Sequence, residues 1–293
     1  MTSIILQLIL NGIIAGAMYA LVASGFSLIY RVTKFMNFAH GAVVLFAAYF
    51  AYYFSDVLGL NFFLSALITI IISAFLGLLI NTVVYRQLRR RKASNAVMLI
   101  SSLALLIFFN GLILALFGSS VKSYDFSRYN SIFDLGLFRI TSVQIVIIAF
   151  ALLMLLFIWL IVKKTRLGKA MRAISDNRDV AQTAGINPER VYGWTFFIAS
   201  FLAGIAGVLI GLEQNLNTQI GTSWGISGFT AAVIGGANSV PGSVLGSFLL
   251  GIVENFGIWY LPSGYKGAIA FGLLFIFLLF RPQGILGKVV DRA

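Results

Sequence analysis

The stretch Val143–Val162, VQIVIIAFALLMLLFIWLIV, carries no charged side chain and is followed at once by Lys163, Lys164 and Arg166. A bilayer core of about 30 Å is crossed by about 20 predominantly apolar residues in an α-helix. Basic residues close to the end of such a run mark the cytoplasmic side of the membrane. The stretch therefore predicts a transmembrane helix whose C-terminal end lies in the cytoplasm.

Seven further apolar runs are long enough, or nearly so, to cross a bilayer. They are Ile4–Ile29, Phe35–Phe54, Phe62–Tyr85, Ala96–Phe117, Tyr192–Leu212, Ser243–Leu261 and Gly267–Phe280. The chain is 60% hydrophobic and 10% charged, whereas soluble domains are about 25% charged. We therefore expect an all-α fold, a polytopic transmembrane helical bundle that forms a single domain over residues 1–293.

The segment 226–261 is too long for one span, and the sequence GGANSVPG at 235–242 interrupts it. Proline removes a backbone donor and glycine loosens the backbone. Non-helical backbone at membrane depth persists only where protein or a water-filled cavity covers it. We expect two unequal pieces here, the first short or re-entrant. The total is then about eight spans plus one short segment.

Seventeen of the 21 Lys and Arg residues fall into four stretches between the apolar runs, at 31–34, 86–92, 163–190 and 281–292. This placement favours membrane topology, and not nucleic-acid binding, as the reason for the net charge of +12. With these stretches inside, the N-terminus lies outside and the C-terminus is cytoplasmic. No basic segment precedes the first run, so we expect a retained span and not a signal peptide.

The loop 163–190 is the longest one on the predicted cytoplasmic side. Ser175 or Asp176 is a suitable N-cap and Gly185 a suitable C-terminal stop, which predicts a helix of two to three turns over 176–184. Asn187 and Pro188 then begin the next helix. A short capped helix between two spans favours docking of a soluble partner, while an ordinary surface helix explains the same pattern equally well.

Four motifs resemble branched-chain amino acid ABC importer permeases, and specifically the shorter of the two permease types that such systems pair. They are NGIIAGAMYALVASGFSLIY at 11–30 with MNFAHG at 36–41, LGKAMRA at 167–173 through AGIN at 184–187, GGANSVPGSVLG at 235–246, and RPQGILG at 281–287. The motifs follow the family's order and cover nearly the whole chain. One departure is Ala237-Asn238, where the family usually has a larger residue and then Gly, which implies a stiffer hinge.

The resemblance implies one subunit of an ATP-driven importer, and its expected location is a bacterial inner (plasma) membrane. Its expected partners are two ABC ATPase subunits, a second related permease (in a heterodimer or a homodimer), a substrate-binding protein, a small-molecule substrate and membrane lipid. The residues implied in ATPase coupling lie in segment 163–190 and are Gly168, Arg172, Asp176, Asp179, Ala181 and Gly185. No Gly-x-x-x-x-Gly-Lys-Ser/Thr phosphate loop occurs in the sequence, so we expect ATP and Mg²⁺ on partner subunits and no enzyme activity in this chain.

Few polar residues fall within the predicted spans, and ionisable groups there usually face a cavity or a partner. The candidates for a translocation path are Asn37, His40, Glu213, Gly236, Gly242, Ser243 and Glu254. Asn37 and His40 are three positions apart, so we expect them to share a helical face, where bracing helices is the favoured role. Glu254 suits the ammonium group of a zwitterion or a purely structural role equally well. With one His and no Cys, no metal site is expected.

Three alternatives to import of branched-chain amino acids stay open. The same machinery could import urea, short amides or another small neutral solute. The chain could also be an ATP-independent channel or facilitator, although this leaves the capped helix of segment 163–190 unexplained. An intramembrane enzyme is the weakest alternative, because the sequence shows neither paired carboxylates nor a Ser/His arrangement.

Overall fold

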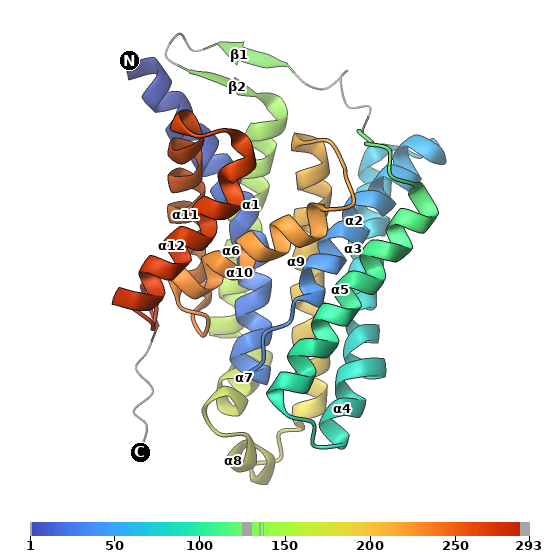
Figure 1. The fold of residues 1–293 in the computed structure, drawn as a ribbon. Coiled ribbons are helices and arrows are strands. Elements are labelled where there is room, and N and C mark those ends of the chain that lie inside the picture. The colour runs from blue at the N-terminus through green and yellow to red at the C-terminus, as the bar shows by residue number, and fades with distance from the viewer. Residues whose placement is uncertain (1, 125–130, 135, 137, 288–293) are drawn as a thin grey trace.

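The computed structural model describes residues 2–124, 131–134, 136 and 138–287, and it is almost entirely helical (Figure 1). The elements are α1 (Thr2–Thr33), α2 (Ala39–Tyr52) with π-helical η1 (Tyr53–Val57), α3 (Phe62–Ile80) with η2 (Asn81–Tyr85), α4 (Arg86–Arg90), α5 (Asn95–Phe117), β1 (Ile132–Asp134), β2 (Arg139–Thr141), α6 (Ser142–Lys164), α7 (Arg166–Asp176), α8 (Arg178–Thr183), α9 (Pro188–Glu213), α10 (Ile220–Gly235), α11 (Val240–Tyr260), η4 (Ser263–Tyr265) and α12 (Lys266–Phe280). The predicted helical bundle is confirmed.

Seven helices are long and apolar enough to cross a membrane, within the part of the chain that the structure describes. Seven of the eight predicted spans correspond to them. The other, Phe35–Phe54, is the 14-residue α2 continued by η1. Figure 1 shows the chain rising from the end of α1 before α2 begins, so this crossing is part loop and part helix. The basic stretch 86–92 is also partly helical, because α3, η2 and α4 run on without a break to Arg90.

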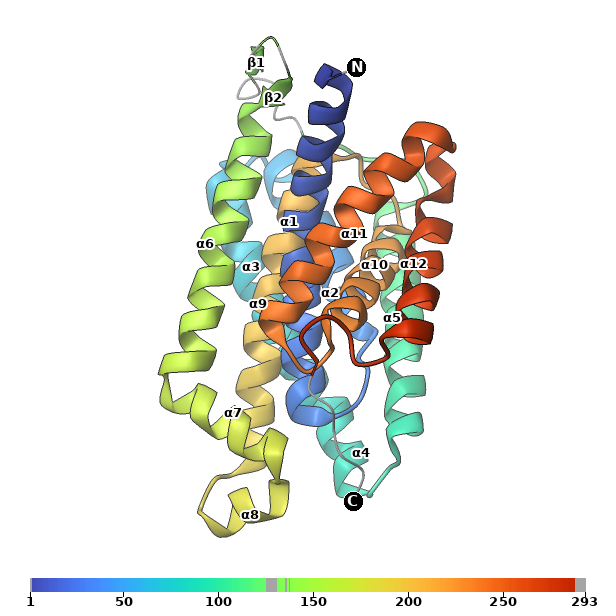
Figure 2. The same ribbon diagram turned by 90° about the vertical axis from the view of Figure 1, so that its left-hand side faces the viewer.

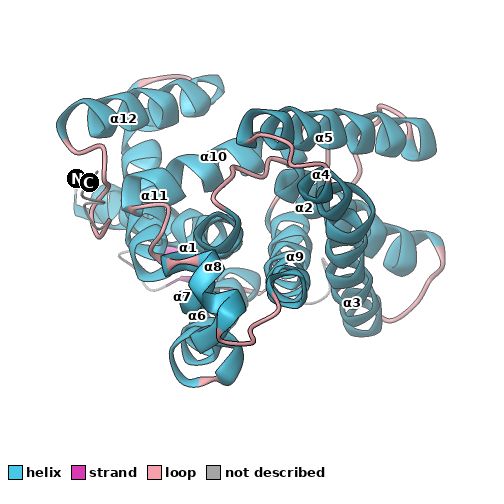
Figure 3. Cartoon of the chain, turned by 90° about the horizontal axis from the view of Figure 1, so that it is seen from below, coloured by secondary structure: helices cyan, strands magenta, loops and turns pink. Residues whose placement is uncertain are grey.

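Helices α1, α2 and α9 form the centre of the bundle (Figures 2 and 3). Their side chains include most of the fully buried apolar residues, such as Leu21, Leu45 and Leu202. Helices α3, α5 and α6 instead expose large apolar side chains, among them Ile107 and Phe108 of α5. A surface of this kind suits lipid or another apolar helix and not water, and α12 exposes a similar one with Phe275 and Leu279.

Helices α1 and α11 pack closely because glycines lie at their crossing. A Cβ atom added at Gly12 would lie 2.8 Å from the Cα of Ile252, and one at Gly16 would lie 2.9 Å from the Cα of Phe248. Small residues spaced by four positions let helix backbones approach each other in lipid, where dispersion contacts replace the hydrophobic effect. The sequence pattern at Gly12 and Gly16 is therefore used for packing within the chain.

The predicted break between two unequal pieces is confirmed, with α10 as the short first piece and α11 as the second. Helix α10 begins at Ile220, six residues before the predicted start of the segment, and crosses the bundle at a steep tilt (Figure 1). Gly236 ends it with a φ of 107°, a conformation that favours glycine. Ser239 then caps α11, its Oγ accepting from the Gly242 N–H at 3.1 Å.

The C-terminal motif lies against this break. The N–H groups of Ile285 and Leu286 donate to the carbonyl oxygens of Ile234 and Gly235 at 2.9 and 3.0 Å. The last carbonyls of a helix have no partner within that helix, so segment 281–287 satisfies the end of α10. Two motifs that are far apart in sequence thus form one unit. Lys288 and Arg292 of the fourth basic stretch lie outside the described residues.

The end of the bundle opposite α7 and α8 carries the small hairpin β1–β2. Thr141 caps α6 in a capping box with Gln144, and Gln7 of α1 accepts from the Arg139 N–H at 2.9 Å. Tyr124, in the segment before the hairpin, donates to the Ala48 carbonyl oxygen at 2.7 Å. These bonds attach the described residues between α5 and α6 to α1, α2 and α6.

Candidate functional site

Two adjoining polar hollows lie at the hairpin end of the bundle. The larger has a volume of about 370 Å³ and the smaller about 250 Å³. Both are lined by Tyr19 of α1, Gln214, Trp224 of α10 and Lys266 at the start of α12. The hollows combine aromatic faces with hydroxyl, amide and ammonium groups, which is the usual composition of a site for a small polar solute.

Glu254 reaches these hollows through Tyr19. The Tyr19 hydroxyl donates to Glu254 Oε2 at 2.6 Å, and Glu254 itself is only 1% exposed. Its second oxygen, Oε1, is buried without a partner among the described residues. Tyr19 also packs against Trp224, with ring centroids 4.8 Å apart. Glu254 therefore lies behind Tyr19, outside the lining of the hollows. Its Oε1 is still able to accept a hydrogen bond.

Glu213 lines the smaller hollow directly. Gln144 of α6 donates to its Oε1 at 2.9 Å, so the carboxylate is held at the hairpin end of α9. The structure thus brings the two predicted acidic residues to the same end of the bundle, with Glu213 in the wall and Glu254 behind it. The sequence alone did not indicate Tyr19, Trp224 or Lys266 as site residues. Aromatic and polar residues are common in and beside apolar spans, so no local pattern distinguishes these three.

Asn37 and His40 are both buried, but they do not share a helical face. Asn37 lies in the turn before α2, whose N-cap is Phe38, and the prediction of a common face is wrong because the helix begins later than expected. The Tyr85 hydroxyl donates to Asn37 Oδ1 at 2.6 Å. The His40 ring packs edge-on against Phe26 at 5.0 Å and fills the space left by Gly25. Both contacts tie together helices of the core.

The three remaining path candidates pack at the break between α10 and α11. A Cβ at Gly236 would lie 2.7 Å from the Gly287 backbone nitrogen, and one at Gly242 would lie 2.2 Å from the Gly235 carbonyl oxygen. The Ser243 hydroxyl donates to the Val240 carbonyl oxygen at 2.8 Å. The structure therefore places these residues in close backbone packing, away from the two hollows.

At the opposite end of the bundle, α7 and α8 project beyond the long helices (Figure 2). The predicted single helix over 176–184 is wrong in its bounds. Helix α7 ends at Asp176, and Asn177 caps α8 by accepting from the Asp179 and Val180 N–H groups at 3.0 and 3.1 Å. Neither Ser175 nor Asp176 is the cap, because the apolar face of α7 continues the helix through them. Gly185 is confirmed as the stop, with a φ of 82°.

Gly168 and Arg172 hold α7 against the end of α6. A Cβ at Gly168 would lie 2.1 Å from the Val162 carbonyl oxygen, and the Arg172 guanidinium donates to that same oxygen. A cation at a helix C-terminus also interacts favourably with the helix dipole. The start of α7 was not predicted from the sequence, although Thr165 is a suitable N-cap residue. Its hydroxyl accepts from the Gly168 N–H at 3.1 Å.

Helices α7 and α8 share a small apolar core with the long helices. It consists of Val32, Met171, Ile174, Ala181, Val191 and Tyr192. Ala181 is the contribution of α8 and is 3% exposed, whereas its neighbour Val180 is 62% exposed. Asp179 is also exposed. The unit of α7 and α8 is thus anchored to α1 and α9 on one side and presents an apolar and an acidic side chain on the other.

Lys34 joins this unit to the break between α10 and α11. Its Nζ donates to Ser175 Oγ and to Asn238 Oδ1, each at 3.3 Å. Burial and the nearby Arg31 lower the pKa of Lys34, while Asp176 opposes the shift. The predicted coupling residue Asp176 therefore lies within the field of this junction. Asn238, where the sequence departs from the family pattern, supplies one of the two acceptor oxygens for Lys34.

The class of protein that this fold defines is a polytopic helical membrane permease with a polar hollow at one end and a projecting helical unit at the other. Residues 8–278 match the family described as branched-chain amino acid transport system / permease component, and the chain belongs to that family.

Two curated relatives illustrate the match. The chain is 34% identical to BraD, a high-affinity branched-chain amino acid transport system permease protein of Pseudomonas aeruginosa, covering 97% of this chain and 96% of the relative. It is likewise 34% identical to LivH of Escherichia coli K12, which carries the same description, with the same coverage. Among solved structures, PsaBC from Streptococcus pneumoniae in complex with Fab aligns over 96% of this chain and 91% of that chain, at 18% identity and a TM-score of 0.45.

Proposed function

We propose that this chain is the membrane-spanning subunit of an ABC importer for branched-chain or similar apolar amino acids. The observation that carries the proposal is the 34% identity along 97% of the chain to permeases of high-affinity branched-chain amino acid transport systems. The two ends of the bundle support it. A polar hollow suits solute transfer at one end, and a docking unit suits an energy source at the other.

The proposed partners are two ATPase subunits, a second related permease and a substrate-binding protein, with ATP and Mg²⁺ bound by the ATPases. Because the basic stretches at 86–92 and 163–190 lie at the α7–α8 end, that end faces the cytoplasm of a bacterial cell and the hollows face outward. The exposed Val180 and Asp179 of α8 are the proposed ATPase contacts, and Gly168, Arg172 and Gly185 shape the segment that carries them.

The route of coupling follows from the anchoring of α7 and α8. Closure of the ATPases would displace α8, and its buried Ala181 would carry the shared apolar core with it. Lys34 would pass the displacement to Asn238 at the break before α11, the helix that holds Glu254. Packed elements with two discrete arrangements convert such small shifts into alternating access.

The outer hollows offer complementary charge to a zwitterionic amino acid. Glu213 in the lining suits an ammonium group, Glu254 adds negative charge from behind Tyr19, and the Lys266 ammonium suits a carboxylate. Tyr19 and Trp224 supply apolar surface for an aliphatic side chain. The start of α11 at Gly242–Ser243 is closed by backbone packing and offers no contact for the carboxylate. Import of urea, short amides or another small neutral solute by the same machinery is the second candidate.

The proposal is tested in proteoliposomes that contain the chain together with its neighbouring permease, ATPases and binding protein. Leucine, isoleucine, valine, alanine and urea are compared as stimulants of ATP hydrolysis and as accumulated solutes. We expect stimulation and accumulation with the aliphatic amino acids. A response to urea alone would support the ABC importer but identify urea, and not an amino acid, as its substrate. Solute conduction by the isolated chain without ATPases would identify a facilitator instead.

A further inference from the structure

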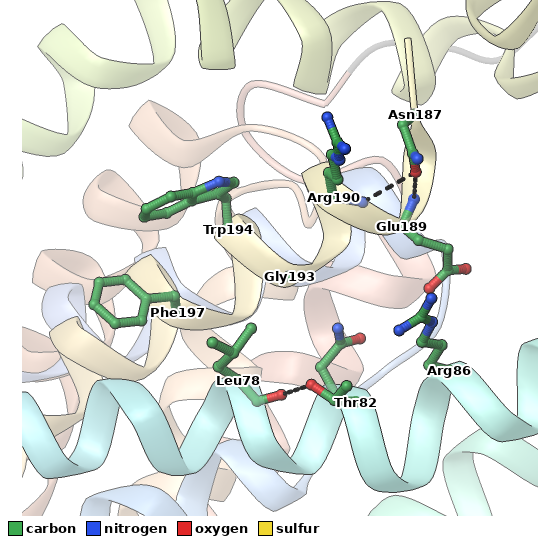
Figure 4. A pocket seen from close by; sticks show the side chains of 10 residues that line it. Leu78, Thr82, Arg86, Asn187, Glu189, Arg190, Gly193, Trp194 and Phe197 are labelled. Carbon is green, nitrogen blue, oxygen red and sulfur yellow. Dashed lines mark hydrogen bonds between the residues drawn. The ribbon is translucent and has the colours of Figure 1, made fainter.

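A groove outside the proposed path lies between the last turns of the α3–α4 helix and the first turns of α9. Its volume is about 600 Å³, and its lining comprises Leu78, Asn81, Thr82, Arg86, Asn187, Glu189, Arg190, Gly193, Trp194 and Phe197. Figure 4 shows Leu78, Thr82 and Arg86 on one helix facing Gly193 and Phe197 on the other. The missing side chain at Gly193 leaves room between the two helices.

The charged lining of the groove has an excess of positive charge. The Glu189 carboxylate is neutralised by Arg89, whose Nε and Nη2 donate to its two oxygens at 3.0 and 2.7 Å. Arg86 and Arg190 make no ion pair among the described residues. The Nε atom of Arg86 is buried and has no hydrogen-bond partner in that part of the chain. A buried guanidinium N–H without an acceptor is costly, so the groove favours an anionic partner.

The end of the groove away from Arg86 is lined by apolar side chains. Trp194 is 56% exposed, and the half-buried Leu78 and Phe197 face each other from opposite walls at that end (Figure 4). Beside the groove on α3, Leu79, which follows Leu78, is 56% exposed, and Phe75, about one turn earlier, is 57% exposed. Tryptophan is typical of the headgroup level of a membrane, and exposed apolar residues of the hydrocarbon core. The groove therefore spans the boundary between the headgroup level and the hydrocarbon core.

We propose that this groove binds an anionic phospholipid. Arg86 and Arg190 would contact the phosphate and the acidic headgroup, because guanidinium groups recognise such oxygens well. Trp194, Phe197 and Leu78 would contact the glycerol and the acyl chains. Basic grooves between transmembrane helices on the cytoplasmic side are suited to acidic lipid headgroups.

The lipid fits this site better than a free phosphate ion does. Asn187 already occupies the first amides of α9 by accepting from the Glu189 and Arg190 N–H groups, so no helix terminus is free to hold a small anion. The groove is also continuous with the lipid-facing surface of α3. The inference goes beyond the proposed function, and the proposed orientation enters it only in assigning the lipid to the cytoplasmic leaflet.

The test measures lipid binding to the full chain, purified in detergent with its co-purifying subunits, by native mass spectrometry and thermal unfolding. Phosphatidylglycerol is compared with phosphatidylcholine and with glycerol phosphate. The variant is R86Q/R190Q, and the matched control is R90Q/R91Q, which removes two exposed charges from the same end of the bundle outside the groove. R190Q alone changes only an exposed side chain and serves if the double variant does not fold.

We expect phosphatidylglycerol to bind and to raise the unfolding temperature, with affinity lowered about thirtyfold in R86Q/R190Q and retained in R90Q/R91Q. R190Q alone should lose several-fold. Equal binding of phosphatidylcholine would overturn recognition of the headgroup charge. An equal effect of glycerol phosphate would assign the site to a soluble anion. Equal loss in R86Q/R190Q and R90Q/R91Q would show general charge attraction, and also overturn the site.

Discussion

The bond between Tyr19 and Glu254 places a carboxyl group one side chain behind the outer hollows. Removing the donor leaves a buried acceptor without a partner, which costs about 1–3 kcal/mol. We therefore expect Tyr19→Phe to lower the unfolding temperature of the purified protein measurably. Tyr260→Phe, at a residue that is 83% exposed, is the matched control and should leave it unchanged. Equal stability of both variants would contradict a structural role for this bond.

Lys34 links the unit of α7 and α8 to the break before α11. Lys34→Met keeps the length of the side chain and removes the donor for both Ser175 and Asn238. We expect the reconstituted importer to keep basal ATP hydrolysis and to lose most of its substrate stimulation and uptake. The exposed Arg91 is the control position, and Arg91→Ala should transport normally. Full coupling in Lys34→Met would exclude this route.

At the scale of elements, α8 is the proposed contact with the ATPase. The Ala181 N–H donates to the Asn177 carbonyl oxygen at 3.1 Å, so proline at 181 removes that bond and disturbs the helix. Ala181→Pro should abolish transport while the protein still inserts into the membrane. Arg178→Pro is a demanding control, because position 178 is the first residue of α8, where proline is tolerated. Uptake and ATPase co-purification are the measurements, and normal uptake in Ala181→Pro would refute the proposal.

The end of α10 gives a prediction about packing. Gly236→Ala places a side chain at a φ of 107° and against the Gly287 backbone, a strain of about 1–3 kcal/mol or more. We expect a lower unfolding temperature and a lower yield of monodisperse protein. Gly272→Ala in α12, where a Cβ meets nothing within 4 Å, should behave like the unmodified chain. Indistinguishable behaviour of the two variants would show that the break tolerates rearrangement.

The elements that the sequence predicts well are those decided by composition over many residues. Uncharged runs such as Val143–Val162 fix a helix whatever its neighbours are. The bounds of α8 were harder to predict, since they depend on a cap that competes with adjacent polar residues. The start of α2 was equally hard to predict, since its N-cap residue is Phe38 and no side chain caps it. Asn177 and Ser175 are both acceptable caps by type, and only the packing of α7 on α1 and α9 selects between them.

The candidate site was predictable only in part for a similar reason. Rare acidic residues in apolar spans mark Glu213 and Glu254, but nothing local marks Tyr19 or Lys266, which meet them from other helices. Glycines at 236 and 242 suggest an opening, and they serve close backbone packing instead. Pair contacts between distant segments, such as Lys34 with Asn238, have no signature in a single sequence.

At the scale of the whole molecule, the orientation in the membrane can be measured directly because the chain has no cysteine. A single cysteine introduced at Thr183 of α8 should react with a membrane-impermeant maleimide only after cells are permeabilised. A single cysteine introduced at Ser120, at the other end of the bundle, should react in intact cells. The reverse pattern would place α8 outside and would exclude the proposed ATPase contact.

The pairing of segment 281–287 with the end of α10 also has a consequence for biosynthesis. The Ile234 and Gly235 carbonyl groups stay without these partners until residues some 50 positions later have been translated. The break between α10 and α11 is therefore completed only after α12 has been synthesised. Messages truncated before codon 284 should yield inserted but unstable products, which membrane quality-control proteases would remove.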